Sequence, residues 1–412
     1  MRVLYSFIIL FSNFLIRFSS LFNKKARKWT AGRKNLFPLF EEKCEGKKNI
    51  VWFHCASLGE FEQGKPLMEK IKQQDENVTL LLTFFSPSGY EVKKNDPIAD
   101  IIAYLPADTP KNAKKFIKII KPKRVFFIKY EFWYNYMNEL SLRNIPFYYV
   151  SAIFRENQYF FKSYGRWFFN HLKKCTHFFV QNENSETLLR KFGISQVTVT
   201  GDTRFDSVYK TAKQPCNLDF IDIIKSDKKL LVAGSTWQQD EKLLCELFTK
   251  INPQYKLVIV PHEVNKERIA QIKRRFHAFS TVCYSEKEEK KLSDFDILIV
   301  DCMGLLNKIY RYADISYIGG AFKTGLHNIL EAAVYKKPLF FGPRYHKFNE
   351  AATLVNLGGA FPVSNSKKMA EKIQFFENNS SEYQSICEIC KKFVETNLGA
   401  TERIAFFQGK NR

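Results

Sequence analysis

The chain has 412 residues, 45% of them hydrophobic and 16% aromatic, so it carries far more apolar surface than a disordered chain would. This length predicts two domains. Lys and Arg outnumber Asp and Glu by 64 to 42, and the net charge of +22 predicts attraction to a nucleic acid, an acidic membrane surface or a phosphorylated substrate. The nine scattered cysteines indicate free thiols in a reducing compartment.

The first 22 residues predict a membrane anchor helix. Residues 3–22 would form a helix of about 30 Å, close to the thickness of a bilayer's hydrocarbon core. Its polar residues Ser6, Asn13, Arg17 and Ser20 form one stripe, which suits either a spanning helix or one that lies in the interface. The basic residues that follow attract anionic headgroups, and for a spanning helix they place the rest of the chain in the cytoplasm. A cleaved signal peptide and a buried first helix are the competing interpretations.

Short apolar runs alternate with helix-length amphipathic stretches along the rest of the chain, which predicts βαβ units and parallel sheets. A less apolar stretch, 210–219, separates two sets of expected strands: 49–54, 78–83, 101–104, 124–128, 147–150, 176–181 and 197–200, then 229–233, 256–260, 281–283, 297–300, 315–318, 338–341 and 359–363. We therefore predict two doubly wound, Rossmann-like α/β domains, 23–211 and 212–412, with a ligand cleft between them. The last helix could pack back across the boundary.

One apolar run ends in Ala56-Ser57-Leu58-Gly59-Glu60. Ser57 and Gly59 permit a tight turn, after which Glu60 opens a helix at the carboxyl edge of the sheet. A carboxylate in that place is stabilised by the helix N-terminus and is accessible to substrate, which suits a general base. A carboxylate that only complements the helix dipole is the structural alternative.

A second turn from strand to helix, Gly319–Glu331, is rich in glycine. Its glycines would let a phosphate approach backbone N–H groups, and Glu331 would accept hydrogen bonds from sugar hydroxyls. The pattern is typical of a nucleotide site, although it is neither a Walker A loop nor the dinucleotide fingerprint. A turn whose glycines serve packing alone is the alternative.

Together these segments resemble the 3-deoxy-D-manno-octulosonic acid (Kdo) transferases, membrane-anchored enzymes of lipopolysaccharide assembly with the two-domain GT-B glycosyltransferase fold. The resemblance extends over about residues 1–360, and the segment that ends at Glu60 matches the family's S-V-G-E. The other matching segments are TFFSPSG at 83–89, YLPAD at 104–108, EFWYN at 131–135, VTGDTRFD at 199–206, AGST at 233–236, GLHNILE at 325–331 and GPRYHKFN at 342–349.

The resemblance implies that Glu60 is the catalytic base. The implied acceptor-side residues are Ser57, Gly59, Glu131 and Arg155. The expected residues of the donor site, which binds cytidine monophosphate (CMP), are Arg204, Ser235, Thr236, His262, Met303, Gly304, Gly320, Asn328 and Glu331. The chain departs from the family in places: Pro261-His262 lacks the Arg of P-R-H, Arg155 is shifted by two positions, and Leu305 stands where the family has Glu.

The resemblance implies inverting transfer of Kdo from CMP-Kdo to the tetraacylated disaccharide bisphosphate precursor of lipid A (lipid IVA), without a cofactor or metal ion. It implies an inner-membrane enzyme whose catalytic domains lie on the cytoplasmic face, against an anionic membrane surface. A GT-B transferase with another nucleotide sugar and another lipid acceptor is the alternative. A nucleic-acid-binding protein would explain the charge, but that charge is spread over both halves and no nucleic-acid signature occurs, so no nucleic-acid partner is expected.

Residues 159–169 combine aromatic with basic side chains. Such a segment suits a headgroup interface or a groove for an acylated, phosphorylated acceptor. A core helix with solvated lysines is the structural alternative.

Overall fold

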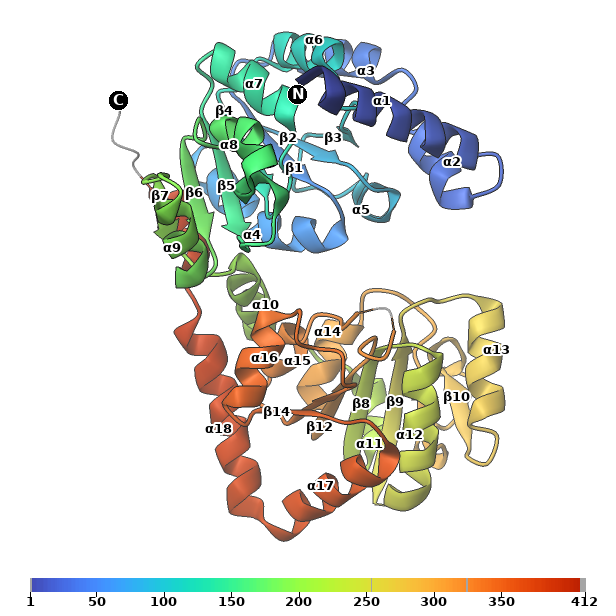
Figure 1. The fold of residues 1–412 in the computed structure, drawn as a ribbon. Helices are drawn as coiled ribbons and strands as arrows, with labels where there is room; N and C mark the ends of the chain where they lie inside the picture. The colour runs from blue at the N-terminus through green and yellow to red at the C-terminus, as the bar shows by residue number, and fades with distance from the viewer. Residues whose placement is uncertain (1, 253, 324, 408–412) are drawn as a thin grey trace. The chain divides into compact units, whose positions relative to one another are not determined.

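The computed structural model describes residues 2–252, 254–323 and 325–407 and divides into two compact units, each built on a parallel sheet (Figure 1). Unit 1 comprises Met1–Ser207 and Asn397–Arg412, and unit 2 comprises Val208–Thr396. The division falls inside helix α10 (Thr203–Lys213), a few residues before the expected one. Met1 and residues 408–412, which belong to the expected first and last segments, lie outside the described residues.

Unit 1 contains a seven-stranded sheet in the order β3-β2-β1-β4-β5-β6-β7. Its strands are β1 (Ile50–Cys55), β2 (Thr79–Phe84), β3 (Ile101–Tyr104), β4 (Arg124–Ile128), β5 (Phe147–Ala152), β6 (His177–Val180) and β7 (Val197–Val199). The strand order reverses between β1 and β4, so the loops that follow these strands diverge and leave room for ligands at the carboxyl edge.

Helices cover both faces of this sheet, because successive side chains of a strand point to opposite faces. Trp52 of β1 packs on Phe116 and Phe127 in one core, and Phe53 lies in the other core with Leu67. The helices of unit 1 are α1 (Arg2–Ser19), α2 (Lys24–Ala31), α3 (Leu36–Cys44), α4 (Leu58–Gln74), α5 (Pro87–Lys93), α6 (Pro110–Ile120), α7 (Tyr134–Leu142), α8 (Arg166–Leu172), α9 (Glu183–Lys191) and α19 (Ala400–Ala405).

Unit 2 contains a second seven-stranded parallel sheet, in the order β10-β11-β9-β8-β12-β13-β14. Its strands are β8 (Lys229–Thr236), β9 (Tyr255–Pro261), β10 (Thr281–Cys283), β11 (Ile297–Ile299), β12 (Ile315–Ile318), β13 (Leu339–Phe341) and β14 (Ala360–Pro362). Its helices are α11 (Asp219–Lys225), α12 (Gln238–Ile251), α13 (Lys266–Arg275), α14 (Leu306–Ile309), α15 (Leu330–Ala333), α16 (Asn349–Asn356), α17 (Ser366–Asn378) and α18 (Ser380–Thr396). Every expected strand of both sets is present, with ends that differ by a few residues, and the prediction of two parallel-sheet α/β domains is confirmed.

The end of the described chain returns to unit 1 after α18. The carboxylate of Asp206 accepts hydrogen bonds from the backbone N–H groups of Gly399 and Thr401, each at 2.7 Å. Arg403 donates to the carbonyl of Thr200, and Ile404 is buried in the core beside α4. These contacts hold α19 on unit 1.

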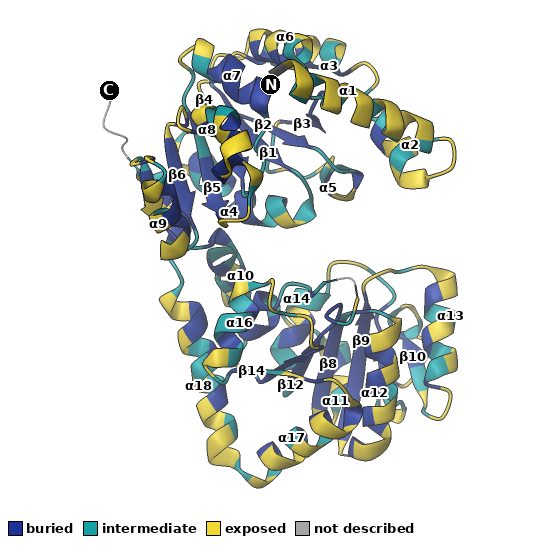
Figure 2. Ribbon diagram, viewed as in Figure 1, coloured by how far each residue is buried: buried dark blue, intermediate teal, exposed yellow. Residues whose placement is uncertain are grey.

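Helix α1 exposes its apolar side chains, as Figure 2 shows by its predominantly yellow colour. Eleven large apolar residues within residues 3–22 are exposed, whereas Ser6 and Asn13 of the polar stripe are half-buried. The hydroxyl of Tyr5 donates to Asp108 at 2.7 Å, and its ring contacts Tyr134 at 5.5 Å. Across the described residues, no helix combines the length and the apolar character needed to cross a membrane, so the spanning form of the predicted anchor has no support.

The aromatic segment 159–169 packs mostly into the core of unit 1. Phe160, Phe161, Phe168 and Phe169 are buried, whereas Tyr164 is exposed. Its residues form two short 3₁₀ turns, η1 (Tyr159–Phe161) and η2 (Ser163–Gly165), and most of helix α8. The buried alternative therefore describes this segment better than a headgroup interface does.

Candidate functional site

Glu60 lies in the first turn of α4, where the chain leaves β1 at the carboxyl edge of the unit 1 sheet. Ser57 is the N-cap residue, and its hydroxyl donates a hydrogen bond to a carboxylate oxygen of Glu60. Gly59 is exposed and Glu60 is half-buried, so the carboxylate is held by the turn and still accessible. The helix N-terminus stabilises its negative charge.

A second carboxylate, Glu131, lies at the same edge after β4. Burial first, and then the charges of Glu60, Glu131 and Glu62, raise the pKa of the Cys55 thiol, which ends β1. Both predicted acidic residues are therefore close to Cys55. Glu60 thus follows β1 and Glu131 follows β4, the two neighbouring strands between which the strand order reverses.

Glu131 is held by a chain of hydrogen bonds that leads into the core of unit 1. Its Oε2 atom accepts from the indole N–H of Trp133 at 2.9 Å and lies 3.1 Å from Nε2 of His54. The other ring nitrogen of His54 is 2.9 Å from the hydroxyl of Thr83, which accepts from the indole of Trp52 at 2.7 Å. Because a carboxylate oxygen only accepts, Nε2–H of His54 is the donor to Glu131. Trp52, His54, Thr83 and Trp133 were not predicted as site residues.

Arg155 follows β5 and is exposed near this acidic edge. Its guanidinium lies 5.8 Å from the ring centre of Tyr130, the residue before Glu131. The predicted acceptor-side residues thus all follow strands at the carboxyl edge of the unit 1 sheet, namely Ser57 and Gly59 after β1, Glu131 after β4 and Arg155 after β5.

In unit 2, three rings stack at the carboxyl ends of β8, β9 and β12. The rings of Trp237 and His262 are 4.8 Å apart, and those of His262 and His327 are 4.3 Å apart. The indole N–H of Trp237 donates to Nε2 of His327 at 2.9 Å. Burial first, and then the neighbouring His262, lower the pKa of His327 to about 4, so His327 is neutral at pH 7. Of the three, only His262 was predicted as a site residue.

The glycine-rich turn lies beside the stacked ring of His327. Gly320 has a φ of +96°, and a Cβ there would lie 2.3 Å from the carbonyl oxygen of Gly325 and 2.8 Å from the ring of His327, so only glycine fits. Asn328 donates from its amide to Glu331 at 3.0 Å. Residue 324, inside this turn, lies outside the described residues.

The other predicted donor residues of unit 2 follow neighbouring strands. Ser235 and Thr236 end β8, and the buried hydroxyl of Thr236 donates to Glu241 at 3.0 Å. Met303 and Gly304 follow β11 and are exposed. The predicted donor residues of unit 2 therefore lie on loops at the carboxyl edge of its sheet.

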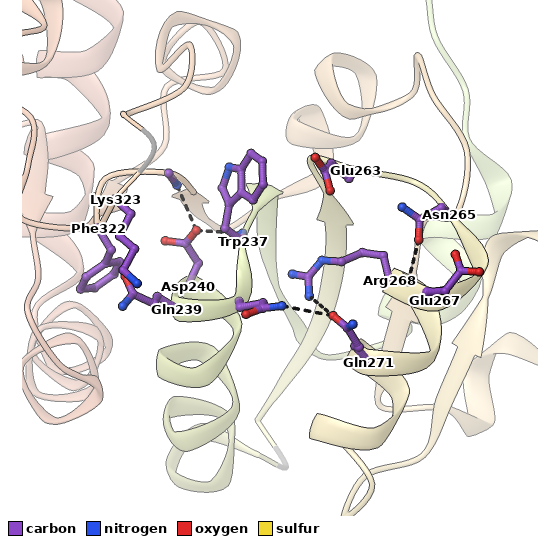
Figure 3. A pocket seen from close by; sticks show the side chains of 12 residues that line it. Trp237, Gln239, Asp240, Glu263, Asn265, Glu267, Arg268, Gln271, Phe322 and Lys323 are labelled. Atoms are coloured by element: carbon purple, nitrogen blue, oxygen red, sulfur yellow. Dashed lines mark hydrogen bonds between the residues drawn. The ribbon is translucent and has the colours of Figure 1, made fainter. Parts of the chain in front are cut away.

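A pocket of about 310 Å³ opens beside the ring stack, between the first turns of α12 and α13 (Figure 3). Asp240 borders it and accepts hydrogen bonds from the backbone N–H groups of Trp237 and Gly320, at 2.9 and 3.0 Å. Arg268, another lining residue, is buried and paired with Glu241. The sequence offered no motif for this pocket, because its residues come from α12, from α13 and the segment before it, and from the glycine-rich turn.

Arg204, a predicted donor residue, belongs to unit 1, whereas the other predicted donor residues belong to unit 2. Its guanidinium donates two hydrogen bonds to Asp202, at 2.8 and 2.9 Å, and Asp202 also accepts from Gln63 of α4. Burial raises the pKa of Asp202, but Arg204 and the other donors outweigh it and lower the pKa overall. Arg204 thus neutralises a buried carboxylate.

Among the described residues, no group of three or more His, Cys, Asp or Glu side chains is arranged to hold a metal ion.

Comparisons with known proteins agree with the architecture. A family model described as 3-deoxy-D-manno-octulosonic-acid transferase (kdotransferase) matches residues 30–207. The 3-deoxy-D-manno-octulosonic acid transferase of Aquifex aeolicus is 27% identical over 346 residues, which cover 82% of this chain and 89% of that protein. The enzyme of the same name from Rickettsia felis is 27% identical over 366 residues, or 85% of this chain and 76% of that protein.

Among solved structures, the UDP-GlcNAc 2-epimerase from Neisseria meningitidis bound to UDP-GlcNAc is similar, with a TM-score of 0.61 and 13% sequence identity. The match covers 87% of this chain and 98% of that protein. At this identity the likeness concerns the fold alone, which is the GT-B type with two parallel-sheet α/β units.

Proposed function

Because the chain belongs to the Kdo transferase family and is a glycosyltransferase, we propose that it transfers Kdo from CMP-Kdo to a hydroxyl of lipid IVA, with inversion at the anomeric carbon. The observation that carries this proposal is the carboxylate of Glu60, fixed by Ser57 in the first turn of α4 and accessible at the edge of the sheet. A general base must combine these two properties.

In the proposed reaction, Glu60 takes the proton of the acceptor hydroxyl while the hydroxyl oxygen attacks the anomeric carbon of Kdo. The bond between this carbon and the phosphate oxygen breaks, and CMP leaves with the bonding electrons. Glu131 and Arg155 orient the acceptor from the same edge of unit 1. The hydrogen bonds from Trp133 and His54 support this role for Glu131, because they hold its carboxylate in one orientation.

The donor binds to unit 2 in this proposal. The stacked rings of Trp237, His262 and His327 provide a flat surface against which a pyrimidine base can pack. Asn328 and Glu331 offer an amide and a carboxylate to ribose hydroxyls. Ser235, Thr236, Met303 and Gly304 complete the proposed donor site. Because Arg204 is paired with Asp202, we assign it to the support of unit 1.

The test of this function is incubation of the purified chain in detergent with CMP-Kdo and lipid IVA, followed by mass spectrometry of the lipid. We expect mass increases in whole Kdo increments and release of CMP. No transfer from CMP-Kdo, together with transfer from another nucleotide sugar, would establish the alternative GT-B transferase instead. Absence of transfer from any nucleotide sugar would refute the enzyme's proposed reaction altogether.

We also propose that α1 holds the enzyme on the cytoplasmic face of the inner membrane, lying along the anionic surface. Two observations support this. The exposed apolar residues of α1 form a continuous surface rather than single scattered side chains, and Ser6 and Asn13 of its polar stripe are half-buried against unit 1. In flotation with vesicles that contain phosphatidylglycerol, the full chain should float, and a variant without residues 1–22 should stay in solution. Equal flotation of both would refute anchoring by α1.

A further inference from the structure

A groove of about 1300 Å³ lies in unit 1 between α1, the segment that joins α2 to α3, and the start of α6. Pockets for small ligands are commonly about 300–1,000 Å³, so this space is large enough for a bulkier molecule. Its apolar lining includes Leu10 and Phe14 of α1, Trp29 of α2, and Phe37 and Pro38 of α3. Leu10 and Phe14 are more than half exposed, at 56% and 63%.

The groove carries positive charge and no negative charge of its own. Five lining residues are basic, namely Arg17, Arg33, Lys34, Lys111 and Lys115, and the lining contains neither Asp nor Glu. Lys115 pairs with Glu41, outside the lining, at 3.2 Å. Within the described part of the chain, Arg17, Lys34 and Lys111 have no carboxylate partner. A ligand that complements this groove is therefore apolar along its length and anionic at its head.

Arg33 adds a fixed positive charge to the groove lining. Its guanidinium donates to the backbone carbonyl groups of Leu105, Trp29 and Phe85, at 3.0, 3.3 and 2.8 Å. Burial lowers the pKa of Arg33 to about 9, which still leaves it charged at pH 7. The three carbonyl dipoles orient the guanidinium, but no carboxylate among the described residues neutralises it.

The groove ends next to the acidic edge of the candidate active site. The ring of Trp29 contacts that of Phe85 at 6.0 Å, and Phe85 contacts Trp133 at 5.1 Å. Trp133 in turn donates to Glu131. Within unit 1, the side chain of Phe85 thus lies between Trp29 of the groove lining and Trp133, which holds Glu131.

We propose that this groove binds an acyl chain of the phosphorylated lipid acceptor, with a phosphate of the acceptor held by Arg17, Lys34 and Lys111. The inference rests on the proposed function and extends it by assigning the acyl chain and the phosphate to residues. Bound in this way, the acceptor has its sugar hydroxyls on the side of Glu131 and Glu60. The three cations recognise the phosphate, and the apolar wall of α1 covers the chain.

The test uses a tetradecyl phosphate that carries bromine on its chain, because bromine quenches nearby tryptophan fluorescence. The full-length protein in its wild-type form should show saturable quenching, which Trp29→Phe should largely remove. A K34E/K111E variant should bind the probe at least tenfold more weakly. The matched control K162E/K174E makes the same charge change at exposed lysines of unit 1 outside the groove, and its affinity should equal that of the wild type.

The binding measurement does not depend on catalysis, so it separates failure of this inference from failure of the proposed reaction. Quenching that survives Trp29→Phe, or equal affinity of K34E/K111E and its control, would overturn the inference. Loss of vesicle binding in K34E/K111E without any saturable binding of the probe would also overturn it, since the groove would then be a contact with the bilayer. If K34E/K111E has a lowered thermal midpoint, K34Q and K111Q singly replace it, each with a smaller expected loss of affinity. In the transfer assay, K34E/K111E should raise KM for lipid IVA at least tenfold.

Discussion

Tyr5→Phe should detach α1 from unit 1 while the rest of the unit stays folded. The hydroxyl of Tyr5 donates to the buried carboxylate of Asp108 at 2.7 Å, and burial raises the pKa of Asp108 to about 6, so at pH 7.5 the acceptor is charged. A hydrogen bond to a charged group contributes about 1.5–3 kcal/mol. The phenylalanine ring keeps the contacts with Tyr134 and Phe168. The substitution therefore removes only the hydrogen bonds of the hydroxyl, which also accepts from the backbone N–H of Tyr134 at 3.4 Å.

The loss should appear in α1 because most of its large apolar side chains make few contacts with unit 1. A change of about 1.5–3 kcal/mol corresponds to roughly 10–150-fold more frequent opening. Hydrogen–deuterium exchange at pH 7.5, followed by mass spectrometry of peptides from residues 2–19 and 50–55, measures this directly. We expect faster exchange in the first peptide and unchanged exchange in β1.

Phe7→Leu is the matched control, since Phe7 lies on the same helix and is 63% exposed. Its exchange should equal that of the wild type. The reasoning would be wrong if Tyr5→Phe left α1 exchange unchanged, or if the acceleration extended equally to β1.

Further predictions concern unit 2. Gly320→Ala should lower the free energy of unfolding by more than about 1 kcal/mol, because its Cβ would clash with neighbouring atoms. Gly304→Ala has a similar positive φ but lies in open space, so it should lower the free energy of unfolding by less. Equal thermal denaturation of the two variants would count against the steric argument. His327 should titrate with a pKa of about 4 in an NMR experiment, and Trp237→Phe should raise that pKa because the indole donates to the unprotonated nitrogen. The folded state favours neutral His327. The stabilisation that this histidine contributes should therefore be complete above pH 6.5 and decline as the pH falls toward 4. An NMR pKa near 6.5 for His327 in the wild type would contradict this prediction.

The strands were predictable because both sheets are buried on both faces. A strand such as β9 (Tyr255–Pro261) is buried at every position, so its sequence is an apolar run interrupted by one charged residue, Lys256. Glu60 was predictable for a similar reason: it follows such a run directly, and a turn from strand to helix places its side chain within a few residues.

The ring stack of unit 2 was harder to predict, because Trp237, His262 and His327 come from loops after three different strands. Nothing in the local pattern of any one of them indicates the other two. The pairing of Arg204 with Asp202 was not predicted for another reason, since the matched motif gives no sign that the carboxylate two residues earlier is buried.

The orientation of helix α1 could not be predicted from the periodicity of its sequence. The spacing of Ser6 and Asn13 correctly predicted one polar stripe, but it did not indicate that this stripe would turn toward the protein. In a soluble protein the apolar face normally packs inward. Only the contacts of Tyr5 with Asp108 and its aromatic neighbours set the direction.

The most direct test of the account is the turnover of Glu60→Gln in the transfer of Kdo to lipid IVA at saturating CMP-Kdo. We expect kcat to fall about a hundredfold or more, the usual contribution of a general base, while calorimetry shows unchanged affinity for CMP. Glu62→Gln, in the same helix turn, should retain nearly full turnover. A Glu60→Gln enzyme with near-normal kcat would contradict the central claim that this carboxylate removes the proton from the acceptor.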